Sequence, residues 1–199
     1  MPETGDFAKT IGLIYDSALD SEVWADALIA IAQFLDVKDL AIGTFDAEKN
    51  IHETLNLPID PDFVRSYVEH WAERNFLWRA SAVLPVGKLF SFECAGRSET
   101  IYRSALYNEW FRPQGMNSVL GANLIVEGGR NTVLTVYRPA SRPEFGPEDA
   151  ARFNVLLPHV RRAMHLRDKV SAGSHAAKNF RAMLDALDKP AFIAIQTPT

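Results

Sequence analysis

Hydrophobic residues recur every three or four positions over the first part of the chain, which is the spacing of one face of an α-helix. In residues 6–19 this face comprises Phe7, Ile11, Ile14, Tyr15 and Ala18. After Asp20 and Ser21, either of which can cap a helix, a second face comprises Trp24, Ala27, Leu28, Ile31 and Leu35. The pattern predicts two amphipathic helices.

An alternating pattern replaces this spacing at residues 39–45, where Leu40, Ile42 and Thr44 alternate with Ala41, Gly43 and Phe45, and again at residues 51–57. A period of two is typical of strands, so we expect an antiparallel pair joined by the polar stretch 46–50. Residues 118–139 contain two apolar runs around Gly128-Gly129, the strongest hairpin signal in the sequence. A further short strand is expected at residues 88–92.

Helices are also predicted in the middle of the chain. Asp60-Pro61 is a helix start, because the carboxylate can cap free amides and proline suits the first helical position. The apolar face that follows comprises Phe63, Val64, Tyr67, Val68 and Trp71. The hydrophobic residues of 72–86 show no regular spacing, so this segment is expected to be irregular. Ser98 is expected to begin a helix that continues to Phe111 and must end at Pro113.

The C-terminal part of the chain predicts a long helix that opens at Gly146-Pro147 and continues to Val170. A linker-like break is expected at residues 171–175, then a helix at 180–187 and a strand at 190–195. We therefore expect one domain over residues 1–171, and a linker helix with the start of a further unit over residues 172–199.

This order of elements predicts an α+β fold, in which a central antiparallel sheet is flanked by helices. GAF and PAS sensor domains are similar in having such a sandwich. The apolar positions Phe153, Leu156, Val160 and Ala163 of the long helix fall near heptad spacing. Heptad spacing is typical of helices that pair, so these residues are the predicted dimerisation face of a homodimer.

Composition narrows the classes of partner. The net charge of -4 provides little basic surface for phosphates, so DNA binding by these residues themselves is disfavoured. The single cysteine, Cys94, excludes an internal disulfide and fits a reducing compartment. No apolar run is long enough to span a bilayer, and the polar start does not resemble a signal peptide. We expect a cytoplasmic protein without a membrane partner.

Catalysis has little support in the sequence. The five histidines show no metal-site spacing with each other or with Cys94, and no phosphate-binding loop or nucleophile elbow is present. Cys94 has Glu93 and Arg97 near it in sequence, which leaves a small enzyme with a cysteine nucleophile as an alternative. The sequence thus favours a protein that is not an enzyme and that binds neither a metal nor a cofactor.

Large aromatic residues are concentrated between positions 67 and 111. They include Tyr67, Trp71, Phe76, Trp78, Phe90, Tyr107, Trp110 and Phe111. Such rings can simply fill a core, because they bury large areas in any domain. They can also form the wall of a ligand cavity that a few polar groups complete. We interpret the cluster as a candidate ligand site, and a pocketless dimerisation or interaction module is the alternative.

Four segments resemble the N-terminal sensor region of LuxR-type helix-turn-helix transcriptional regulators. They are IYDSALDSEVWADALIAIAQFL from residue 14, SYVEHWAERNFLWR from residue 66, SALYNEWFRPQGM from residue 104 and LLPHVRRAMHLRDKV from residue 156. The resemblance implies a domain that senses a small hydrophobic molecule and forms dimers. It also implies that DNA is bound only through a helix-turn-helix module, which this chain does not contain.

The resemblance also bears on the ligand. In acyl-homoserine-lactone receptors of this family a tyrosine and a tryptophan four residues apart, followed by an aspartate, hold the lactone. Tyr67 and Trp71 match the first two, but the segment NFLWR stands where the family shows Asp-Pro. Loss of that carboxylate removes a hydrogen bond of about 1.5 to 3 kcal/mol. The sequence therefore disfavours an acyl-homoserine lactone and leaves two alternatives, a different hydrophobic ligand or none.

Overall fold

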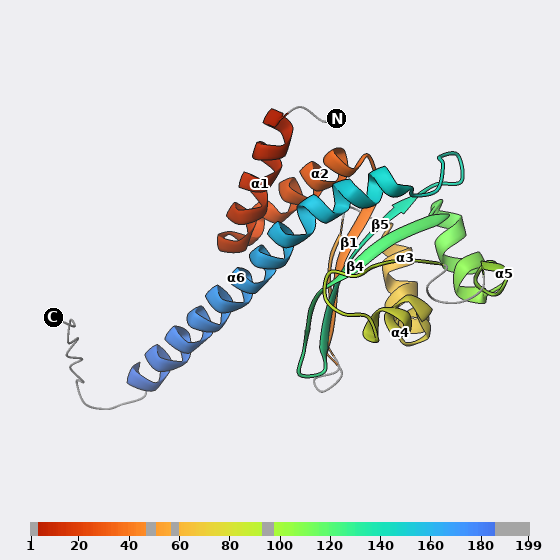
Figure 1. The fold of residues 1–199 in the computed structure, drawn as a ribbon. Helices are drawn as coiled ribbons and strands as arrows, with labels where there is room; N and C mark the ends of the chain where they lie inside the picture. The colour runs from red at the N-terminus through yellow and green to blue at the C-terminus, as the bar shows by residue number, and fades with distance from the viewer. Residues whose placement is uncertain (1–3, 47–50, 57–59, 93–97, 186–199) are drawn as a thin grey trace.

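The computed structural model describes residues 4–46, 51–56, 60–92 and 98–185. Over these residues an antiparallel sheet has the strand order β2-β1-β5-β4-β3 (Figure 1). The strands are β1 (Asp39–Asp46), β2 (Ile51–Asn56), β3 (Leu89–Ser91), β4 (Ser118–Glu127) and β5 (Arg130–Arg138). The helices are α1 (Thr4–Leu19), α2 (Trp24–Leu35), α3 (Pro61–Ser66), α4 (Phe76–Ala82), α5 (Ser98–Tyr102) and α6 (Pro147–Asp185). The predicted α+β class is confirmed.

Local sequence signals fix the sheet. Gly128 and Gly129 both have positive φ angles, 52° and 78°, which lets a two-residue turn join β4 to β5. The β4–β5 hairpin predicted at this position is confirmed. Strand β1 pairs with β2 on one side and with β5 on the other, so Asp39 stands opposite Tyr137 and Ala41 opposite Thr135.

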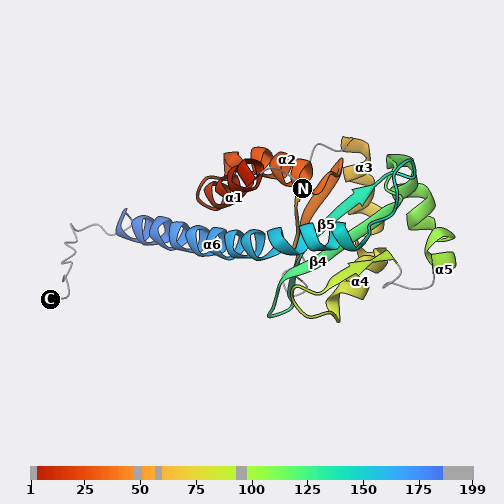
Figure 2. The same cartoon turned by 45° about the horizontal axis from the view of Figure 1, so that its top comes forward.

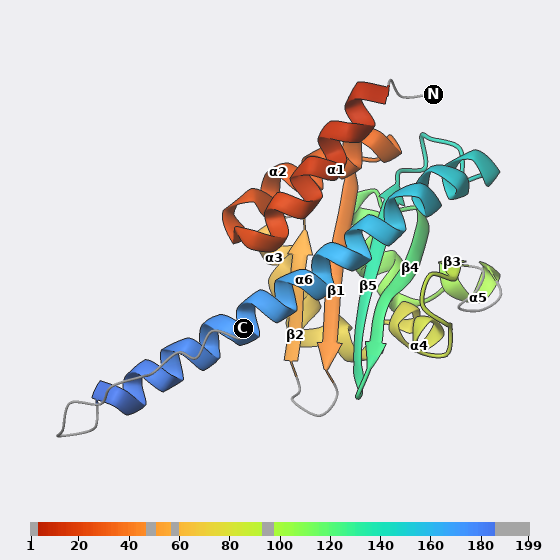
Figure 3. The same cartoon turned by 60° about the vertical axis from the view of Figure 1, so that its left-hand side comes forward.

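Helices α1, α2 and α6 cover one face of the sheet (Figure 3). Alternate strand residues such as Leu40, Ile42, Leu134 and Val136 point into this layer and are buried there. Arg138 anchors the start of α6: its Nη1 and Nη2 atoms donate to the two carboxylate oxygens of Asp149 at 2.9 and 2.7 Å.

The predicted dimerisation face lies inside this same layer. Phe153 is 1% exposed, and Leu156, Val160 and Ala163 are 0% exposed, because they pack against the sheet and helices of their own chain. These side chains are not available to a partner, so assigning them to a dimer interface is wrong. Formation of a homodimer stays a prediction and requires another surface.

The opposite face of the sheet is covered by α3, α4, α5 and the segments that follow them (Figure 2). Helix α3 continues into a π-helical turn, η2 (Tyr67–Trp71), and then a 3-10 turn, η3 (Ala72–Arg74). A second π-helical turn, η5 (Tyr107–Phe111), follows α5.

Two predictions in this layer were wrong. Residues 76–82 form α4, where we expected an irregular segment; the Asn75 side chain caps this helix by accepting from the Leu77 amide at 2.9 Å. The single helix expected from Ser98 to Phe111 is interrupted after Tyr102, where the Ser104 hydroxyl donates to the Ile101 carbonyl at 2.6 Å and accepts from the Tyr107 amide.

Helix α6 crosses the sheet and then extends beyond it (Figures 1 and 2). Its backbone remains helical through residues 171–175, so the break expected there is absent. The strand expected at 190–195 lies outside the described residues. The division into domains at residue 171 therefore stays a prediction.

Candidate ligand cavity

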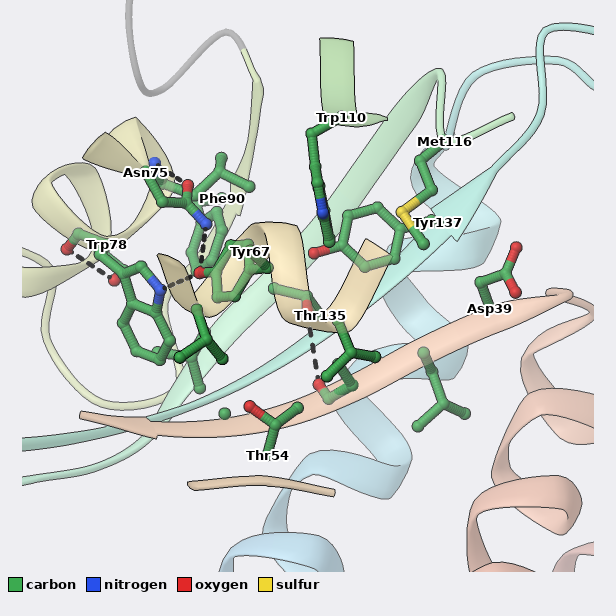
Figure 4. A pocket seen from close by; sticks show the side chains of 18 residues that line it. Asp39, Thr54, Tyr67, Asn75, Trp78, Phe90, Trp110, Met116, Thr135 and Tyr137 are labelled. Carbon is green, nitrogen blue, oxygen red and sulfur yellow. Dashed lines mark hydrogen bonds between the residues drawn. The ribbon is translucent and has the colours of Figure 1, made fainter. Parts of the chain in front are cut away.

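A cavity of about 110 Å³ lies between the sheet and the layer formed by α3, η2, α4 and η5 (Figure 4). This space is well above the roughly 10 to 15 Å³ that a cavity needs to hold a single water molecule. The walls are mainly apolar. The lining residues from the sheet and the chain leading into β4 include Asp39, Ala41, Gly43, Thr54, Phe90, Met116, Val133, Thr135 and Tyr137. Those from the covering layer include Val64, Tyr67, Val68, Asn75, Leu77, Trp78, Ser81 and Trp110.

Local sequence brings the covering layer into place. Asp60 caps α3 by accepting from the Asp62 amide at 2.9 Å, and Pro61 occupies the first turn, as predicted. The π-helical turn η2 then carries Tyr67 to the cavity and buries Trp71. Such turns are rare and often occur at functional sites, and here both π-helical turns of the described chain carry predicted site residues.

The Tyr67 hydroxyl is the polar centre of the cavity. It accepts a hydrogen bond from Asn75 Nδ2 at 2.9 Å and another from Trp78 Nε1 at 2.7 Å. A phenol oxygen has two acceptor sites and one hydrogen to donate. Because both acceptor sites are used, Tyr67 can offer a bound molecule only a donated hydrogen bond.

The protonation state of Tyr67 supports that role. Burial raises the pKa of its phenol above the ordinary value, and this outweighs the opposing effect of the bonds from Asn75 and Trp78. The hydroxyl therefore keeps its proton at neutral pH.

Tryptophan rings close the cavity around this hydroxyl. The Trp110 ring packs against Tyr67 with centroids 4.9 Å apart, and its Nε1 donates to the Phe63 carbonyl at 3.0 Å. The Trp78 ring lies over Gly43 of β1: a Cβ at Gly43 would stand 2.9 Å from Cζ2 of that ring. Glycine is required there so that the indole can approach the strand and reach Tyr67.

Asp39 is the only charged residue among the described residues that line the cavity. Its side chain is half-buried and makes no hydrogen bond or ion pair with another described residue. Burial raises the pKa of this carboxyl, an effect that the charge of Lys38 partly opposes. An unpaired carboxylate at the wall of an apolar cavity is unfavourable, and a bound cation or N–H donor would relieve that cost.

The structure separates the predicted site residues into two groups. Tyr67, Trp78, Phe90 and Trp110 line the cavity. Trp71, Phe76, Tyr107 and Phe111 do not line it; they belong to the aromatic core around it. Tyr107, for example, donates its hydroxyl to Asn117 Oδ1 at 2.7 Å. Ligand binding by any of these residues stays a prediction.

Sequence reasoning missed the wall that the sheet contributes. Asp39, Thr135 and Tyr137 reach the cavity because β1 and β5 are paired and expose alternate residues on the same face. The alternation in each strand was visible in the sequence. The pairing was not, since the two strands lie about a hundred residues apart in the chain.

The described residues give little support for a cysteine nucleophile, a metal site or a membrane-spanning helix. Cys94, the nucleophile of the alternative enzyme hypothesis, lies outside them. No group of three metal-binding side chains occurs among them, and the absence of a metal or cofactor stays a prediction. None of their helices combines the length and the apolar character that crossing a membrane requires.

No model of a known protein family matches this sequence, and no curated protein matches it. Solved structures do match the fold. The ligand-binding domain of VqsR from Pseudomonas aeruginosa has a TM-score of 0.66 at 20% identity, over 83% of this chain and 98% of that one. CepR2 from Burkholderia cenocepacia, an N-acylhomoserine lactone dependent LuxR-family transcription factor, has a TM-score of 0.58 at 13% identity, over 82% and 94% of the two chains.

SdiA from Escherichia coli has a TM-score of 0.54 at 13% identity, over 83% of this chain and 69% of SdiA. A complex of SdiA with octanoyl-rac-glycerol matches at the same TM-score and identity. None of these names describes an enzyme. At such identities the likeness concerns the fold alone, and that part of the predicted resemblance is confirmed: this chain has the fold of the ligand-binding domains found in LuxR-family regulators.

Proposed function

We propose that this chain is the ligand-sensing domain of a LuxR-type transcriptional regulator, and that it binds a compact hydrophobic molecule in the cavity beneath Tyr67. The observation that carries the proposal is the cavity itself, apolar on most sides and provided with one hydroxyl whose hydrogen is free to be donated. Pockets for small molecules combine an apolar wall with a few placed polar groups in this way.

The neighbouring structures support this proposal. The VqsR structure is that of its ligand-binding domain. CepR2 depends on an N-acylhomoserine lactone, and SdiA has been solved with octanoyl-rac-glycerol bound. The cavity of this chain is smaller than the several hundred Å³ typical of drug-sized ligands, so we propose a shorter molecule. That choice agrees with the sequence, which disfavours an acyl-homoserine lactone.

The sheet offers a route from the cavity to α6. In β5, Val133 and Thr135 line the cavity, while Leu134 and Val136 belong to the core that α6 covers. A ligand that shifts this strand therefore changes both layers. We propose that α6 passes the change on, within a cytoplasmic homodimer, to a helix-turn-helix module that the described residues do not contain. In this scheme the chain is not an enzyme.

A binding screen with a cavity-filling variant tests the function. Compact hydrophobic compounds with a carbonyl or hydroxyl oxygen are screened by thermal unfolding; a binder at a hundred times its Kd should add about 2.7 kcal/mol of stability. Ala41→Leu places a larger side chain in the cavity and should abolish that gain. Ala25→Leu, on the exposed side of α2, is the matched control and should preserve it. A binder that stabilises both variants equally would place binding elsewhere and contradict the proposal.

A further inference from the structure

The charges around the cavity restrict what it can hold. Lysine, arginine and histidine are absent from the described residues that line it, and Asp39 contributes its one carboxylate. A ligand with a carboxylate or phosphate would meet only a like charge there. An opposite charge or an N–H donor would give Asp39 the partner that no other described residue provides.

Asp39 and the Tyr67 hydroxyl lie at two separate places along the cavity. Asp39 is the first residue of β1, and Gly43, which lies under Trp78, is four residues further along the same strand. Four residues of extended strand span about 13 Å. The Tyr67 hydroxyl is bonded to Trp78, so the donor belongs to the Gly43 end. Figure 4 shows Asp39 and Trp78 at opposite ends of the lining side chains.

We propose that the ligand is a compact hydrophobic amine with a hydrogen-bond acceptor at its other end. Its ammonium group pairs with the Asp39 carboxylate, its apolar middle contacts residues such as Trp110, Met116 and Val133, and its acceptor receives the hydrogen bond of the Tyr67 hydroxyl. This inference rests on the proposed function and adds the polarity of the ligand to it.

The physical reason for an amine is the state of Asp39. The carboxylate is removed from part of its water without gaining a bond, and an ammonium group offers both opposite charge and up to three N–H donors. Lys38 lies just before β1 and is not among the residues that line the cavity. A ligand without an N–H donor would leave the carboxylate without a hydrogen-bond partner among the described residues.

Three probes of similar size test the proposal by NMR titration of the complete chain. They are 4-methoxybutylamine, which has both groups, hexylamine, which lacks the acceptor, and 1-methoxypentane, which lacks the amine. We expect 4-methoxybutylamine to bind most tightly. Asp39→Asn should lower the binding affinity for both amines about tenfold or more, since charged hydrogen bonds are worth about 1.5 to 3 kcal/mol. The affinity for the ether should not change. Tyr67→Phe, which also frees the N–H donors of Asn75 and Trp78, should change the affinity for 4-methoxybutylamine and leave the affinity for hexylamine unchanged.

Asp26→Asn is the control for net charge, because Asp26 is exposed on α2. Equal binding of the ether and the amines, or equal effects of Asp39→Asn and Asp26→Asn, would overturn the inference about polarity and leave the proposed function standing. The same holds if the probes fail while compounds from the thermal screen bind. Failure of every compound, in the probe set and in the screen, would overturn both.

Discussion

Replacing Tyr67 with phenylalanine removes the one oxygen that accepts from Asn75 Nδ2 and Trp78 Nε1, at 2.9 and 2.7 Å. Asn75 is 6% exposed, so its amide has little access to water. A buried donor without a partner costs about 1 to 3 kcal/mol. Since Trp78 is only half-buried, we expect Tyr67→Phe to lower the free energy of unfolding by about 2 to 4 kcal/mol.

Urea and thermal unfolding measure this loss, which corresponds to a Tm lower by about 4 to 16 °C for a chain of this size. Tyr107→Phe is the matched control, because Tyr107 is also buried but makes a single side-chain bond, to Asn117, outside the cavity. Its expected cost is about 1 kcal/mol. In a ¹⁵N spectrum, Tyr67→Phe should also move one of the four tryptophan indole signals. Equal losses in the two variants, with unmoved indole signals, would refute the bonding scheme around Tyr67.

Three further substitutions test other parts of the structure. Gly43→Ala should cost about 1 to 3 kcal/mol by pushing Trp78 away from β1, whereas Gly12→Ala, with open space around it in α1, should be neutral or stabilising in the same unfolding assay. Leu156→Ala should lower the free energy of unfolding by about 2 to 5 kcal/mol, because Leu156 lies in the core. Val155→Ala, at a half-exposed position, should lower it by only about 0.5 kcal/mol. If Leu156→Ala changed the oligomeric state and left the stability unchanged, the core assignment would be contradicted. Burial alone would raise the pKa of Asp149, but hydrogen bonds from Arg138 and the Gly146 amide lower it below 3.8. The ion pair of Asp149 with Arg138 therefore stabilises the fold above pH 3.8, and this contribution is lost as the pH falls and Asp149 is protonated. Asp149→Asn should lower the free energy of unfolding at pH 7 and reduce the loss of stability below about pH 4, as measured by urea titrations.

Local patterns predicted much of the fold. The hairpin at Gly128-Gly129 depends on a turn that only two adjacent residues determine. Helix α4 was missed because the hydrophobic residues of 76–82 show no helical spacing, although its capping residue, Asn75, stands two residues before the amide that it accepts from. Its formation depends on tertiary packing, which a window of sequence does not contain.

The site and the dimer face show the same limit. The aromatic residues indicated the region of the cavity, but its sheet wall depends on the pairing of β1 with β5. Heptad spacing correctly predicted an apolar stripe that includes Phe153 and Leu156. It wrongly predicted that the stripe packs against a second chain, because these residues lie in the core of their own chain. An apolar stripe packs equally well against a second chain or against the sheet of its own chain, and spacing alone does not distinguish the two.

The π-helical turn at Tyr67–Trp71 contains one residue more than an α-helical turn would need. A turn of this kind takes up a single extra residue without rotating the helical turns on either side of it. Deleting one residue within it would restore α-helical geometry and shorten the spacing of Tyr67 and Trp71 from four residues to three. The change would be confined to the turn that carries Tyr67 to the cavity, which makes the extra residue a marker for recognising proteins that share this binding geometry when their sequences have diverged.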